Sequence, residues 1–147
     1  MTTFLNFETM KVYTDTSVIG GCYDVEFKQW SNALIQEFVD GTKHIMLSDL
    51  TIRELEFARQ EVREKVMEIP EQHRVAIGIT DEAIQLAETY INEGALTNKS
   101  YNDALHIALA TLNNSDVLAS WNFKHIVNIE RIRLYNSINL RLGYRMI

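Results

Sequence analysis

The stretch KVYTDTSV at residues 11–18 is the first strong structural signal in the chain, because it joins a β-favouring run to a turn that begins with an acid. Residues 11–15 are a short run of β-favouring residues, and Asp15-Thr16-Ser17 followed by Gly20-Gly21 ends it. The first prediction is therefore a short strand whose carboxyl end carries Asp15.

Outward from this stretch, strands alternate with helices along the chain. Apolar residues at helical spacing predict helices, compact apolar runs predict strands, and Gly41, Pro70 and Gly94 predict breaks. This alternation predicts a parallel α/β sheet covered by helices on both faces. The predicted helices are 25–39, 51–67, 80–94, 100–113 and a terminal turn, and the further predicted strands are 44–48, 116–121 and 132–135.

Length and composition describe an ordinary globular chain. The 147 residues, 46% hydrophobic and 23% charged, favour one domain over residues 1–147 and exclude a disordered or fibrous protein. The single cysteine, Cys22, excludes an intrachain disulfide and is interpreted as a small buried hydrophobe. No signal-peptide pattern and no apolar run of about 20 residues is visible, so we expect a cytoplasmic protein with no membrane partner.

The charge is unevenly distributed. The formal net charge is −6, from 14 Lys and Arg against 20 Asp and Glu, which argues against a polyanionic partner. Residues 124–147, however, carry five basic residues against the single acid Glu130. The acidic excess therefore belongs to the body of the chain, and the basic C-terminal segment remains able to contact phosphates.

Four oxygen-bearing side chains fall near predicted strand ends or helix starts: Asp15, Glu54, Asp103 and Asn122. In an open α/β sheet, ligands bind beyond the carboxyl ends of the strands, so these side chains can converge at one edge. Carboxylates without Cys or His at ligand spacing suit a hard cation such as Mg²⁺ or Mn²⁺. Each acid also has a purely structural interpretation: Asp15 as an N-cap, Glu54 in a capping box with Thr51, and Asp103 as a complement to the helix dipole.

Four short motifs, in order, resemble those of the PIN domain. They are VYTDTSV at residues 12–18, LTIREL at 50–55, NDALHIA at 102–108 and LASWNF at 118–123. The chain looks like a bacterial VapC-type PIN protein, and the resemblance spans essentially residues 11–147. It implies a three-layer fold with a central parallel sheet flanked by helices. It also implies a Mg²⁺- or Mn²⁺-dependent endoribonuclease, commonly the toxin of a toxin–antitoxin pair and commonly a homodimer, with an RNA substrate and a cognate antitoxin.

The resemblance also implies roles for individual residues. Asp15, Glu54 and Asp103 match the three characteristic acids. Ser17 matches the hydroxyl residue that follows the first acid and helps to hold it, and Ser120 matches the Ser or Thr just before the fourth position. Many relatives carry Asp at the fourth position, where this chain has Asn122, and the missing charge puts a second metal in doubt. We expect Asp15 and Asp103 to bind the metal directly, Glu54 to bind through water or orient the nucleophile, and Asn122 to complete the shell.

Other interpretations remain open. Asn122 favours a binding module that retains the PIN fold, has lost turnover and holds an antitoxin or RNA. A phosphoacceptor receiver domain is disfavoured, because Asp15-Thr16-Ser17 lacks an acidic pair. His106 is interpreted as a core or interhelix histidine in preference to a site residue. Trp121 and Phe123 could stack bases, with Trp121 expected to belong to the core.

Overall fold

The computed structural model describes residues 8–147. It has four strands: β1 (Met10–Thr14), β2 (Lys43–Ser48), β3 (Arg74–Ile77) and β4 (Val117–Ala119). The helices are α1 (Thr16–Gly20), α2 (Lys28–Asp40), α3 (Asp49–Glu56), α4 (Gln60–Met67), α5 (Asp81–Asn92), α6 (Tyr101–Leu112) and α7 (Ile129–Arg141). Short 3-10 turns span Gly21–Tyr23, Glu71–His73 and Asn98–Ser100. None of the described helices is long and apolar enough to cross a membrane.

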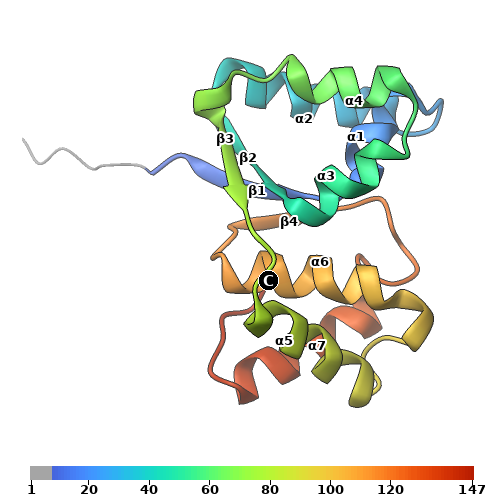
Figure 1. The fold of residues 1–147 in the computed structure, drawn as a ribbon, viewed down its shortest axis with the longest axis vertical. Coiled ribbons are helices and arrows are strands. Elements are labelled where there is room, and N and C mark those ends of the chain that lie inside the picture. The colour runs from blue at the N-terminus through green and yellow to red at the C-terminus, as the bar shows by residue number, and fades with distance from the viewer. Residues whose placement is uncertain (1–7) are drawn as a thin grey trace, which may run out of the picture.

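The strands form one parallel sheet in the order β3-β2-β1-β4. Central β1 pairs with β2 through Val12 opposite Ile45, and with β4 through Val12 opposite Val117. All four strands therefore point the same way, and their carboxyl ends share one edge of the sheet (Figure 1). The predicted parallel α/β sheet is confirmed.

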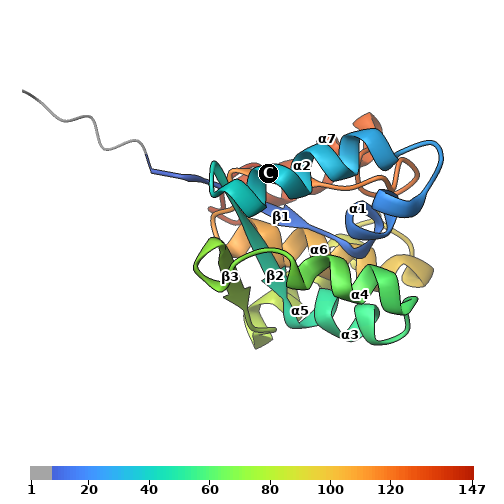
Figure 2. The same ribbon diagram turned by 90° about the horizontal axis from the view of Figure 1, so that it is seen from above.

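Alternate residues of the central strands enter two different cores. Val12 and Ile45 pack with residues of α1, α2, α3 and α4, whereas Tyr13 and Met46 pack with residues of α5, α6 and α7. Because successive side chains of a strand point to opposite faces, the sheet is covered on both sides. Figure 1 shows the three layers, and Figure 2 shows the α1–α4 layer from above. Cys22 is buried in the α1–α4 layer, as predicted.

Three details of the sequence-based assignment are wrong. The predicted strand 132–135 lies inside α7, where Asn128 caps the helix by accepting from the backbone N–H groups of Glu130 and Arg131. The predicted helix 51–67 is two helices, because the chain leaves the helical conformation between Phe57 and Arg59. Edge strand β3 was not predicted at all: it follows Pro70 closely and has only four residues.

Candidate active site

Asp15 lies directly after β1, where it is only 5% exposed and caps α1. Its two carboxylate oxygens accept hydrogen bonds from hydroxyls: Oδ1 from Ser17 Oγ at 2.6 Å and Oδ2 from Ser120 Oγ at 2.6 Å. Oδ1 also accepts weakly from the backbone N–H of Val18 at 3.4 Å. Burial raises the pKa of Asp15, and the hydrogen bonds from Ser120 and Ser17 oppose that rise. Ser17 thus contacts the first acid as expected, and Ser120 contacts the same carboxylate, a contact that was not predicted. The supporting role of both serines in an active site remains a prediction.

The position of Ser120 follows from the sheet. Strand β4 lies beside β1, and the backbone N–H of Asp15 donates to the carbonyl of Ala119 at 3.4 Å. Ser17 also holds the β4 loop, since its Oγ accepts from the backbone N–H of Trp121 at 2.9 Å. Both serines therefore contact the acid and bind β4 to the start of α1.

Glu54 lies in the second turn of α3, after β2. The N-cap of this helix is Ser48, whose Oγ accepts from the backbone N–H of Thr51 at 3.1 Å. Thr51 is therefore not an N-cap, and the capping-box interpretation of Glu54 is wrong. Glu54 Oε1 instead pairs with Nε2 of His106 in α6.

Asp103 lies in the first turn of α6 and contacts the loop after β4. Its Oδ2 lies 3.0 Å from Nδ1 of His125. Asn122 shapes this loop, because its Oδ1 accepts from the backbone N–H groups of Lys124 and His125 at 3.2 and 3.0 Å. The side-chain oxygen expected to complete a metal shell thus caps a turn, and its role as a ligand remains a prediction.

The predicted residues therefore share one edge of the sheet, but two of the acids are paired with histidines. Among residues 8–147, no three His, Cys, Asp or Glu side chains are arranged closely enough to hold a metal ion as they stand. Asp116, at the start of β4, bonds the backbone N–H of Lys11 at the opposite end of the strands, so it does not join the site.

Sequence reasoning did not identify His125 as a partner of Asp103, and it gave His106 only a minor chance of contacting the site. Spacing in the sequence could have indicated both histidines as neighbours of the site. His106 lies three residues after Asp103 on α6, and His125 lies three residues after Asn122. His106 is 2% exposed, so it is buried as predicted, yet it also contacts Glu54.

An aromatic cluster borders the loop after β4. Trp121 stacks on Phe27, with ring centroids 4.5 Å apart and planes at 13°, and Phe123 lies 6.1 Å from each ring. Trp121 is half-buried and Phe123 is 55% exposed. Phe123 is thus the member of this cluster whose ring is most accessible to a ligand.

The basic C-terminal segment is partly engaged within the chain. Arg141 pairs with Glu93, and Arg131 donates to the carbonyl of Ala95 at 2.9 Å. Both contacts direct these side chains to the turn after α5 and not to Asp15. A phosphate contact from this segment therefore depends on its other basic residues.

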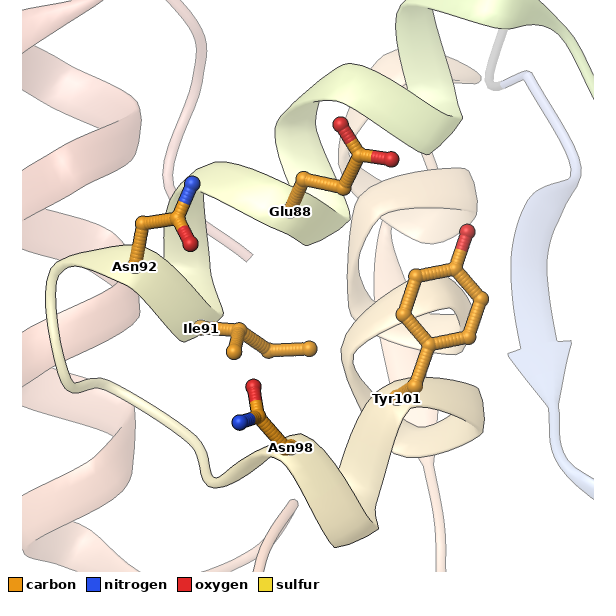
Figure 3. Close-up of a pocket in the computed structure, with 5 residues that line it drawn as sticks. All are labelled: Glu88, Ile91, Asn92, Asn98 and Tyr101. Carbon is orange, nitrogen blue, oxygen red and sulfur yellow. The ribbon is translucent and has the colours of Figure 1, made fainter.

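A hollow lies between α5 and the start of α6 (Figure 3). Its lining combines one carboxylate, two amides, an aliphatic side chain and a phenol ring. None of the predicted site residues lines it. The lining residues are Glu88, Ile91, Asn92, Asn98 and Tyr101.

No protein-family model matches the sequence, and no curated protein matches it by sequence. Solved structures do match. VapC20 of Mycobacterium tuberculosis, described as a toxin that cleaves the sarcin–ricin loop, aligns with a TM-score of 0.59 at 12% identity. That alignment covers 92% of this chain and 98% of VapC20.

A second match is VapBC2 from Rickettsia felis, solved with a DNA fragment from its promoter. It aligns with a TM-score of 0.52 at 16% identity, over 80% of this chain and 93% of the matched chain. Both alignments include most of the sheet-and-helix framework described above. The chain therefore has the PIN-domain fold of the VapC type.

Proposed function

We propose that this protein is a metal-dependent endoribonuclease, the toxin of a toxin–antitoxin pair. The observation that carries the proposal is Asp15: a buried carboxylate at the carboxyl end of the central strand, oriented by Ser17 and Ser120. The proposal is supported by the fold shared with VapC20, a toxin that cleaves RNA at the sarcin–ricin loop.

The chemistry of the donors fits Mg²⁺ or Mn²⁺. Hydroxyls and one backbone N–H are the hydrogen-bond donors to the buried carboxylate of Asp15, and a buried anion without a cationic partner is costly. Hard cations prefer carboxylate oxygens, so Asp15, Glu54 and Asp103 would hold the ion, with Asn122 as a further oxygen donor. When bound, a divalent ion offsets phosphate charge and lowers the pKa of water.

The protein's own residues prepare the site for in-line attack on a phosphodiester. Ser17 and Ser120 keep Asp15 in one orientation through two 2.6 Å hydrogen bonds. His125, in the loop after β4, contacts the carboxylate of Asp103 through Nδ1 at 3.0 Å. The exposed ring of Phe123 offers a surface on which a base next to the scissile phosphate can stack.

We further propose that the antitoxin contacts the α3–α4 layer. Large apolar side chains are exposed there, among them Ile52, Phe57 at 91% exposure and Met67. A shallow apolar groove between α3 and α4 includes Ile52, Leu55 and Met67. Burying such a surface would stabilise a complex. A homodimer remains a proposal, which size-exclusion chromatography with light scattering would test.

The deciding experiment compares Asp103→Asn with Asp116→Asn on a panel of structured RNAs, with Mg²⁺ or with EDTA. We expect Mg²⁺-dependent cleavage by the unmodified protein. Asp103→Asn should lower it by about 100-fold or more, because several kcal/mol of charge stabilisation are removed. Asp116 lies at the opposite end of the strands, so Asp116→Asn should cleave normally. Equal activities, or cleavage that persists in EDTA, would contradict the proposal.

The second candidate is a binding module without turnover. It is favoured by Asn122, whose side-chain oxygen is hydrogen-bonded to backbone, and by the pairing of Glu54 and Asp103 with histidines. Thermal unfolding with increasing Mg²⁺ separates the two candidates. A metal-binding site raises the unfolding temperature with concentration, whereas a binding module without a metal site gives little change.

A further inference from the structure

A buried chain of hydrogen bonds connects the sheet to Glu54. Tyr13, in β1 and fully buried, places its Oη 2.7 Å from Nδ1 of His106, whose ring packs edge-on against it. The other ring nitrogen, Nε2, pairs with Oε1 of Glu54. One imidazole in α6 thus bridges a strand residue and a candidate site residue in α3.

The neighbouring donors are compatible with one direction for this chain of hydrogen bonds. Thr51 donates its hydroxyl to the carbonyl of Thr14 and its backbone N–H to Ser48 Oγ. Ser48 Oγ lies 2.8 Å from Tyr13 Oη and 3.2 Å from Thr51 Oγ1, so Ser48 can donate its proton to Tyr13. Tyr13 then donates to Nδ1 of His106, and Nε2–H is left to donate to Glu54. In this arrangement each donor is used once.

We propose that His106 is a positioning residue for Glu54, held by Tyr13 in the tautomer that carries its proton on Nε2. The Nε2–H donates to one carboxylate oxygen of Glu54 and leaves the other oxygen for a metal ion or its water. The inference rests on the proposed function and deepens it, since it says how one of the acids is held.

Two further observations support this assignment. Burial raises the pKa of Tyr13, so its hydroxyl keeps its proton, and remains a donor, throughout the neutral range. Glu54 is one-third exposed on a surface helix and has three rotatable side-chain bonds, so a single fixed donor removes most of its rotamer freedom. Partners that orient a ligating side chain typically change metal affinity or activity by about 10- to 100-fold.

The first arm of the test measures the tautomer directly and requires no activity. Long-range ¹H–¹⁵N correlation spectra of the histidine rings should show His106 protonated on Nε2. Tyr13→Phe should disturb that pattern. The matched control is Tyr135→Phe, which removes another buried tyrosine hydroxyl, donated to the carbonyl of Ile126 at 3.0 Å, and should leave His106 unchanged. A proton on Nδ1 alone in the unmodified protein would overturn the inference.

The second arm measures Mn²⁺ binding by calorimetry and RNA cleavage under saturating metal. Tyr13→Phe and His106→Asn should weaken Mn²⁺ binding or lower kcat by about 10- to 100-fold, with KM for RNA unchanged. His106→Gln should recover part of the loss, because its amide N–H extends about as far as Nε2. Losses in Tyr135→Phe equal to those in Tyr13→Phe would show a merely structural role and overturn the inference.

The two proposals fail separately. If the unmodified protein cleaves no RNA, the nuclease assignment fails, and the Mn²⁺ titration of the same variants still decides the role of His106. If cleavage is normal in both Tyr13→Phe and His106→Asn and Mn²⁺ binding is unchanged, the positioning role fails while the nuclease assignment stands. Tyr13→Phe also keeps the inference testable should the histidine variants not fold.

Discussion

Ser120→Ala is expected to destabilise the metal-free protein through Asp15. The variant removes a buried 2.6 Å hydrogen bond to a carboxylate, and it also removes the acceptor for the backbone N–H of Asn122. Hydrogen bonds to charged groups contribute about 1.5–3 kcal/mol. For a chain of this size, each kcal/mol lowers the unfolding temperature by roughly 2–4 °C, so a decrease of about 3–12 °C is expected at pH 7 in EDTA.

The effect should depend on pH in a definite direction. Burial raises the pKa of Asp15 in the folded state above its unfolded value, so this group favours folding most when protonated, and that contribution is lost as pH rises through the folded pKa. Removing the Ser120 donor raises the folded pKa further. The difference between Ser120→Ala and the unmodified protein should therefore be largest at neutral pH and shrink as Asp15 becomes protonated.

Circular dichroism melts of Ser120→Ala and of the unmodified protein, from neutral pH down to the pH at which Asp15 is protonated, would measure the difference in unfolding temperature. The control is Ser115→Ala, another buried serine, whose hydroxyl contacts only the weak acceptor Met46 Sδ at 3.1 Å. Its effect should be small and independent of pH. Equal melting temperatures for the two variants at pH 7, or a Ser120→Ala effect that stays constant toward acid, would refute the reasoning.

Three further outcomes are expected. Asp15→Asn should abolish the rise in melting temperature that Mn²⁺ gives the unmodified protein; a rise of the same size would remove Asp15 from the metal site. Phe123→Ala should weaken RNA binding by about 5- to 150-fold, equivalent to about 1–3 kcal/mol of stacking, with the melting temperature unchanged; unaltered affinity in a fluorescence titration would argue against base stacking. Phe57→Ser, at a side chain 91% exposed, should leave stability unchanged and weaken antitoxin binding in a pull-down, and normal binding would place the antitoxin elsewhere.

The framework of the fold was predictable because its strongest signals are local. The run around Val12 and the helical stripes of α5 and α6 each specify an element without reference to distant residues. The segment 132–135 was wrongly predicted as a strand because Ile132 and Tyr135 favour a strand locally. Tyr135 and Ile138 are buried, at helical spacing, in the core that α7 shares with α5 and α6. This tertiary packing stabilises a helix here instead of a strand. Strand β3 was missed for a different reason: its four residues form a strand because they pair with β2, and not because of a strong local signal.

The candidate site likewise has residues that the sequence predicts and contacts that it does not. The acids and the serines lie at strand ends and helix starts, which the sequence marks. Their partners are set by packing across the fold, since Glu54 meets His106 at a separation of 52 residues and Asp103 meets His125 at 22. A single sequence carries no record of which helix faces lie against each other, so the contacts of these histidines required the three-dimensional structure.

The pairing of β4 with β1 has a consequence for how the protein is made. The Ser120–Asp15 contact joins residues 105 positions apart, and the loop that carries Asn122 and His125 follows it. During translation at roughly 5–20 residues per second, about 5–20 s separate the synthesis of the two partners. A nascent chain therefore lacks the supported Asp15 site until β4 has left the ribosome. If the protein cleaves RNA, the ribosome that makes it is exposed to the finished site only after β4 and the loop that follows it have been made.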